Sequence, residues 1–134
     1  MRTWLEGLFG KGRLRTADET PLESRAEILP EERAVLLVGI LDDPAAREDE
    51  KYDAASYLEE FSGPFVESSL ARIIRAEDFT SVLAQHAAES LGEIWARTGR
   101  VDVAFMAELR GPAKDEVFGI LGARAPHLLP PGAF

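Results

Sequence analysis

The chain has 134 residues, of which 46% are hydrophobic, and it carries a formal net charge of -9. A single globular domain of this length buries about two thirds of the surface of its unfolded chain, so it can fold without covalent cross-links. The absence of cysteine excludes disulfides, thiolate metal sites and a cysteine nucleophile. No apolar run approaches the roughly 18 residues needed to cross a bilayer, and the N-terminus lacks the apolar core of a signal peptide. We therefore expect a cytoplasmic protein without integral membrane association.

The charge is unevenly distributed along the chain. Residues 1–15 hold four basic side chains and one acidic side chain, a local charge of +3, so residues 16–134 carry the remaining -12. A body this acidic repels phosphate backbones, which argues against nucleic-acid binding. The same charge favours a basic protein partner.

The N-terminal segment, residues 1–29, combines an apolar stripe with basic residues. The stripe consists of Trp4, Leu5, Leu8 and Phe9, and the cations that follow it are Lys11, Arg13 and Arg15. Thr20 and Glu23 form a capping box around Pro21, which predicts the start of a helix. We favour a cap that covers the exposed core of the first helical hairpin. The alternative is weak peripheral contact with a membrane through Trp4, Leu8 and Phe9.

Proline and glycine divide the rest of the chain into windows of helical length, and apolar residues recur in these windows at spacings of three and four. The pattern predicts helices over 30–41, 47–62, 64–74, 80–98, 101–110 and 112–123, with Asp78 or Thr80 as the cap of the fourth and Gly99 at its end. Alternation with period two never persists, so no strand is expected. The predicted fold class is all-α.

The residue pattern of one helical face occurs twice in the sequence. Tyr52–Phe61 (YDAASYLEEF) and Gln85–Ile94 (QHAAESLGEI) share an Ala-Ala pair, a Leu and a Glu at an offset of 33 residues. At the same offset, the preceding helices share three apolar positions: Leu37, Ile40 and Leu41 correspond to Leu70, Ile73 and Ile74. A period near 33 that consists of two helices is typical of a solenoid, in which each hairpin buries its apolar face against the next.

The segment Ala87-Ala88-Glu89-Ser90-Leu91-Gly92, followed by a turn and a helix with spaced apolar residues, resembles the HEAT-like helical repeats, especially the short bacterial type. The resemblance covers Pro30 to about Ala123. It implies stacked antiparallel helical hairpins, an α-solenoid, over residues 30–124, with a C-terminal tail over 125–134. The turn Thr98-Gly99-Arg100 departs from the Pro-and-Asp turn of such repeats, so an irregular helical bundle is the alternative.

The resemblance also implies where a partner binds. In HEAT-like stacks the second helix of each hairpin lines the concave face, which assigns this role to the helices that start at Glu31, Pro64 and Val101. The candidate partner-binding residues on these helices are Arg33, Glu67, Arg72, Asp102, Met106 and Glu108. Met106 and Val103 point away from the apolar stripe of their helix. They are either buried against the last helix, which we favour, or exposed apolar contacts for a partner.

No constellation of residues indicates catalysis, a metal or a cofactor. The two histidines, His86 and His127, are 41 residues apart and lack further ligands or a paired nucleophile. The acidic run Glu48, Asp49, Glu50 and Asp53 fits the first turn of a helix better than a cation site, because it lacks the spacing of a calcium loop.

These observations predict a non-catalytic protein-interaction module, which binds a basic partner through an acidic helical-repeat surface as an adaptor or as an inhibitor of the immunity type. Two alternatives remain. One is an accessory, lyase-like factor for a cofactor-attachment enzyme, which the resemblance to short HEAT-like proteins allows. The other is a structural homo-oligomer that joins through an uncapped end.

Overall fold

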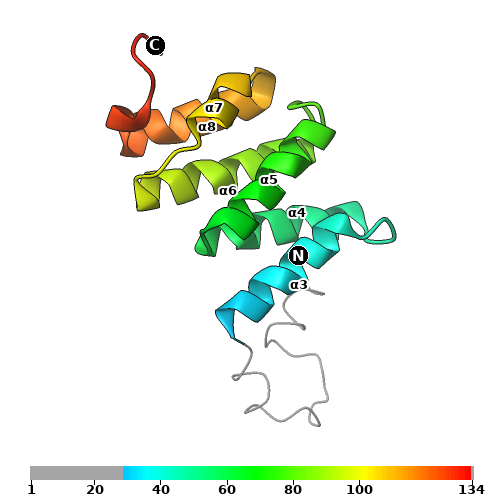
Figure 1. Ribbon diagram of the computed structural model, residues 1–134. Coiled ribbons are helices and arrows are strands. Elements are labelled where there is room, and N and C mark those ends of the chain that lie inside the picture. Colours follow the sequence, from blue (N-terminus) through cyan, green and yellow to red (C-terminus); the bar gives the residue numbers. More distant parts are fainter. Residues whose placement is uncertain (1–28, 134) are drawn as a thin grey trace.

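The computed structural model describes residues 29–133, and this part of the chain is helical without strands (Figure 1). The α-helices are α3 (Pro30–Asp42), α4 (Glu48–Tyr57), α5 (Pro64–Ala76), α6 (Val82–Thr98), α7 (Val103–Glu108) and α8 (Gly111–Arg124). Two 3-10 turns follow α4 and α8: η1 (Leu58–Glu60) and η2 (Pro126–Leu128). The predicted all-α class is confirmed for these residues. The predicted N-terminal stripe and capping box lie outside them.

Local chemistry sets most helix boundaries where the sequence predicts them. α3 and α5 begin at prolines, whose missing N–H is not needed in the first turn. Gly63, just before α5, has a φ of 104°, a conformation that side chains disfavour. Gly99 ends α6 with a φ of 75°, and its N–H donates to the carbonyl oxygen of Trp95 at 2.8 Å.

The start of α6 differs from the prediction. Its N-cap is Ser81, whose Oγ accepts a hydrogen bond from the backbone N–H of Ala84 at 3.0 Å. Asp78 and Phe79 take left-handed φ values of 55° and 67°, so they turn the chain away from α5 and cannot open a helix. The helix therefore begins only after Ser81, and the prediction of Asp78 or Thr80 as the cap is wrong.

The helix α6 occupies the middle of the described structure. It packs against α4 on one side and α8 on the other, and α5 also lies against it. The helix α3 packs on α4 and α5 at one end of the molecule (Figure 1). In this view α3, α5 and α7 lie in front of α4, α6 and α8.

Small residues let the helices approach α6 closely. The two Ala-Ala pairs of the predicted repeat, on α4 and α6, are fully buried. Beside them the buried Ser90 hydroxyl donates to the carbonyl oxygen of Ala55 at 2.6 Å, which ties α6 to α4. On the side of α8, a Cβ at Gly92 would lie 3.2 Å from Cδ1 of Ile120. A larger residue at position 92 would therefore push α8 away from α6.

Most of the apolar positions that recur at spacings of three and four are buried. The three apolar positions shared by α3 and α5 are all buried, as are Phe105 and Leu109. Phe65 is 52% exposed because it lies in the first turn of α5, where Val66 takes the buried position. Ala71 in the middle of α5 is buried, whereas Ala104 is exposed on the short helix α7.

None of the helices between residues 29 and 133 has the length and apolar character required to cross a bilayer.

Candidate partner-binding face

The helices α5 and α7 form a cleft over α6, which we call the α5–α7 cleft. Its volume is about 260 Å³. Side chains of Glu67, Ser68 and Arg75 from α5, of Asp102 and Phe105 at α7, and of Leu91 and Trp95 from α6 line it. Trp95, Phe105 and Leu91 are buried. Asp102 and Arg75 are exposed, and Glu67 is half-buried. The cleft thus has an apolar, aromatic floor and a charged rim.

Backbone donors hold the two carboxylates of the rim. Oε2 of Glu67 accepts a hydrogen bond from the N–H of Gly63 at 2.9 Å, which fixes the side chain over the first turn of α5. Oδ1 of Asp102 accepts from the N–H of Phe105 at 3.0 Å, because Asp102 is the N-cap of α7. Each carboxylate forms these bonds with one oxygen and makes no ion pair within residues 29–133. A negative charge therefore remains on each side of the cleft.

Glu108 neutralises the arginine of the rim. Nε and Nη2 of Arg75 donate to the two carboxylate oxygens of Glu108 at 2.8 and 3.0 Å, a bidentate pair between α5 and α7. The hydrogen bonds from Arg75 lower the pKa of Glu108, and the same bonds raise the pKa of Arg75. The guanidinium also lies over the ring of Phe105, 4.7 Å from its centroid. Glu108 is thus the direct ion-pair partner of Arg75, and the more distant charge of Asp102 also raises the pKa of Arg75.

The structure brings some of the sequence-predicted residues together and separates others. Glu67 and Asp102 line the same cleft, and Glu108 lies at its edge through Arg75. Arg72 instead pairs with Asp42 at the end of α3, with Nη1 2.7 Å from Oδ1. Arg33 is half-buried on α3, outside the cleft.

Met106 does not belong to the exposed face. It is only 6% exposed, as expected from the favoured interpretation that it packs inward. Val103, by contrast, is 73% exposed at the start of α7. Both residues line one cavity of about 330 Å³ with Phe118 and the C-terminal tail, and Val103 stays exposed because it lies in the first turn of α7. Met106 is therefore removed from the candidate contact residues.

Several residues that line the cleft are not among those predicted from the sequence. The predicted helix 64–74 ends before Arg75, but α5 continues to Ala76 and so carries Arg75 one turn beyond Ala71 on the face of the cleft. Apolar spacing places Trp95 and Phe105 in the core, and they are buried there while also forming the floor of the cleft. The spacing of Glu67, Ala71 and Arg75 at i and i+4 is the signal that could have placed Arg75 correctly.

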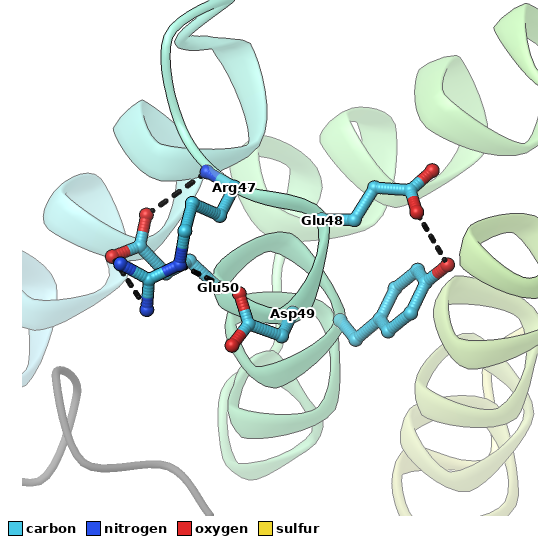
Figure 2. A network of polar contacts seen from close by, with 5 residues as sticks. Arg47, Glu48, Asp49 and Glu50 are labelled. Atoms are coloured by element: carbon cyan, nitrogen blue, oxygen red, sulfur yellow. Dashed lines mark hydrogen bonds and ion pairs between the residues drawn. The ribbon is translucent and has the colours of Figure 1, made fainter.

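The acidic run at the start of α4 forms local contacts (Figure 2). Arg47 contacts two of its members: Nε donates to Oδ1 of Asp49 at 3.1 Å, and the backbone N–H donates to Oε1 of Glu50 at 3.0 Å. Glu48 accepts a hydrogen bond from the hydroxyl of Tyr52 at 3.3 Å. The hydrogen bond from Arg47 lowers the pKa of Asp49. Within residues 29–133, no group of three or more histidine or carboxylate side chains is arranged to hold a metal ion.

The two histidines lie apart from the cleft. His86 is half-buried between α6 and α4, with its ring 5.1 Å from the ring of Tyr52 and Nδ1 3.5 Å from Oγ of Ser56. His127 is exposed in η2. Neither histidine is among the residues that line the α5–α7 cleft.

A second group of carboxylates lies on the opposite layer, where α6 meets η1. Burial raises the pKa of Glu59, and the neighbouring carboxylates Glu93 and Glu89 raise it further. Two arginines offset this charge: Nη1 of Arg124 lies 2.8 Å from Oε1 of Glu93, and Arg97 lies close to Glu59. The α5–α7 cleft is therefore the better candidate for attracting a cation.

No known protein family, curated protein or solved structure matches the chain.

Proposed function

We propose that this chain is a non-catalytic protein-binding module, whose helices stack as two-helix units and whose α3, α5 and α7 face receives a basic segment of a protein partner. The observation that supports this proposal is the α5–α7 cleft. Two carboxylates that form no ion pair within residues 29–133 stand on its rim, and the arginine that lines it is neutralised by Glu108.

A lysine or arginine side chain of the partner fits the chemistry of the cleft. The cation would approach the free oxygens of Glu67 and Asp102, and the apolar part of its side chain would lie on the floor formed by Trp95 and Leu91. The net charge of -9 would add long-range attraction, which raises the rate of association more than the affinity. A small acidic module with such a face serves either as an adaptor or as an inhibitor that covers a basic surface.

Neutralising the two carboxylates tests the proposal. Glu67→Gln with Asp102→Asn keeps the oxygen acceptors for the backbone N–H groups of Gly63 and Phe105 and removes two charges. Each charge-assisted contact is worth about 1.5–3 kcal/mol, so the double variant should bind the partner at least tenfold more weakly. The partner is captured from an extract of the source organism with the wild-type chain, identified by mass spectrometry, and titrated against both proteins by calorimetry.

A matched control makes the result specific. Glu60→Gln with Asp115→Asn removes the same two charges from exposed positions outside the cleft, and should leave binding within about twofold of the wild type. If the two double variants bind equally well, the cleft is not the binding site. If binding by the wild-type chain is also indifferent to salt, the partner is not recognised through its charge.

A further inference from the structure

The helix α3 is apolar on every side. From Ala34 to Leu41 it contains no polar side chain. A helix that is apolar all round is normally buried all round, since each exposed apolar side chain keeps its surface in water. If the described part of the chain, residues 29–133, were sufficient to cover α3, its contacts would therefore surround the helix.

These contacts cover only one side of α3. Its inward residues lie against α4 and α5, whereas Val35 is 56% exposed and Leu36 is 41% exposed. Two further apolar side chains near α3 are exposed. Leu29, directly before the helix, is 55% exposed, and Phe65, at the start of α5, is 52% exposed. We call these four residues, Leu29, Val35, Leu36 and Phe65, the outer α3 face.

The outer α3 face is grooved. Val35 and Phe65 line one groove, of about 450 Å³, together with Pro30 and Phe61. Val35 and Leu36 line a second groove, of about 430 Å³, whose other walls are Glu31 and Glu32. The grooves share Val35 and Glu31, so they form one apolar surface with carboxylates at its edge.

The opposite end of the molecule is closed by the chain itself. There Leu128, Leu129 and Ala133 of the C-terminal tail pack against the core beside α7 and α8. The terminal elements of a helical stack need such covers, because no further helix buries their outer side. At the α3 end, the chain enters the described structure at Leu29, directly beside the uncovered face, and 28 residues precede it.

We propose that the outer α3 face is the docking site of the chain's own residues 4–9. This segment carries the apolar stripe Trp4, Leu5, Leu8 and Phe9. The 19 residues from Gly10 to Ile28 would reach about 60 Å when extended, several times the roughly 20 Å length of α3. The tether gives the segment an effective concentration on the order of millimolar, far above that of a free partner.

Charge and size favour this occupant over the alternatives. The basic residues Lys11, Arg13 and Arg15 follow the stripe, and the groove is edged by Glu31 and Glu32. The same carboxylates would be repelled by an anionic membrane surface. Four exposed side chains are few compared with the roughly 20–30 residues that each partner contributes to a stable interface, which disfavours a second copy.

Tryptophan fluorescence tests the proposal in the full chain, which holds two tryptophans. Trp95 is 1% exposed, so subtracting the spectrum of a Trp4→Phe variant from that of the wild type isolates the emission of Trp4. We expect Trp4 to emit at a blue-shifted wavelength and to resist quenching by acrylamide at every protein concentration. Val35→Asp with Leu36→Asp should increase the quenching of Trp4 several-fold. Val103→Asp, at an exposed apolar site far along the chain, should leave the quenching unchanged.

Engineered cysteines provide a second measurement that does not depend on charged variants. Because the chain has no cysteine, Leu8→Cys with Val35→Cys creates one possible pair, which should form a disulfide within the monomer under mild oxidation. Leu8→Cys with Val103→Cys is the matched control and should remain reduced or link different molecules.

Three results would overturn the proposal. In the first, Trp4 of the wild type is quenched as readily as Trp4 of the double aspartate variant, and the Leu8→Cys, Val35→Cys pair does not close. In the second, protection of Trp4 appears only as the protein concentration rises, which assigns the face to a second copy. In the third, protection appears only with vesicles of anionic lipid, which assigns the stripe to a membrane. None of these measurements involves the α5–α7 cleft, so they leave the proposed function separately testable.

Discussion

Single residues decide where the helices end and how the cleft is charged. Gly99 shows the first effect: its left-handed φ of 75° stops α6 and turns its N–H back to Trp95. Asp102 shows the second, because its role as the N-cap of α7 also fixes its carboxylate on the rim of the cleft. Capping of α7 therefore positions the Asp102 carboxylate as a candidate binding group, and no specialised motif is required.

Replacing Gly99 tests the backbone effect. Gly99→Ala should lower the free energy of unfolding by about 1 kcal/mol, because a Cβ disfavours the left-handed conformation. Gly119→Ala is the matched control. Gly119 is exposed within α8, a Cβ added there would meet no atom within 4 Å, and its φ is not left-handed. This control should raise the free energy of unfolding by about 0.5–1 kcal/mol in urea denaturation. Changes of the same sign would contradict the account.

Helices that are distant in the sequence are tied together by side chains that reach backbone carbonyls. Arg97 of α6 is one example: Nη1 donates to the carbonyl oxygen of Glu59 at 2.9 Å, and Nη2 donates to that of Phe61 at 2.8 Å. These carbonyls lie at the end of η1, where no helical N–H can satisfy them. Arg97 of α6 thus supplies hydrogen-bond donors to carbonyl groups at the end of η1.

Removing this link should weaken the packing of η1 on α6. We expect Arg97→Ala to reduce the free energy of unfolding by about 1–2 kcal/mol, the range for a hydrogen bond from a charged donor after allowance for exposure. Arg100→Ala removes the same charge at an exposed position whose side chain forms no hydrogen bond within residues 29–133, and it should cost less than about 0.5 kcal/mol. Equal losses in thermal unfolding followed by circular dichroism would argue that only charge matters.

At the scale of the whole molecule, one apolar cluster extends from Ala34 on α3 to Ala125 after α8. The helix α6 crosses the middle of this cluster and contacts helices on both sides. Disrupting α6 should therefore destabilise the whole described structure rather than one end of it.

Leu91, which is buried on α6, provides the test of this cooperativity. Leu91→Ala should reduce the free energy of unfolding by about 2–5 kcal/mol, and the far-ultraviolet and near-ultraviolet transitions should remain coincident. Val82→Ala truncates an exposed side chain of the same helix and should change stability by less than about 0.5 kcal/mol. Separate transitions for the two signals would indicate that the two ends unfold independently.

The helical class, most helix boundaries and most buried faces follow from the sequence alone. Proline and glycine act on the backbone of their own turn, and apolar periodicity depends only on residues three and four positions apart. Pro30, Pro64 and Gly99 are therefore predictable without knowledge of the fold. The cap at Ser81 was not, because the left-handed turn at Asp78 and Phe79 is held from outside: the N–H of Ala113 donates to the carbonyl oxygen of Phe79 at 3.1 Å.

Only the tertiary structure decided which charges meet and which apolar faces stay exposed. Asp102 lies 35 residues from Glu67 and shares a cleft with it, while Arg75 is neutralised by Glu108 from 33 residues away. The exposure of Val35 and Leu36 likewise depends on where α4 and α5 lie against α3. Local rules fix the direction of a side chain relative to its own helix. The neighbours of that side chain depend on how the helices pack, since residues tens of positions apart can contact one another only after the chain has folded.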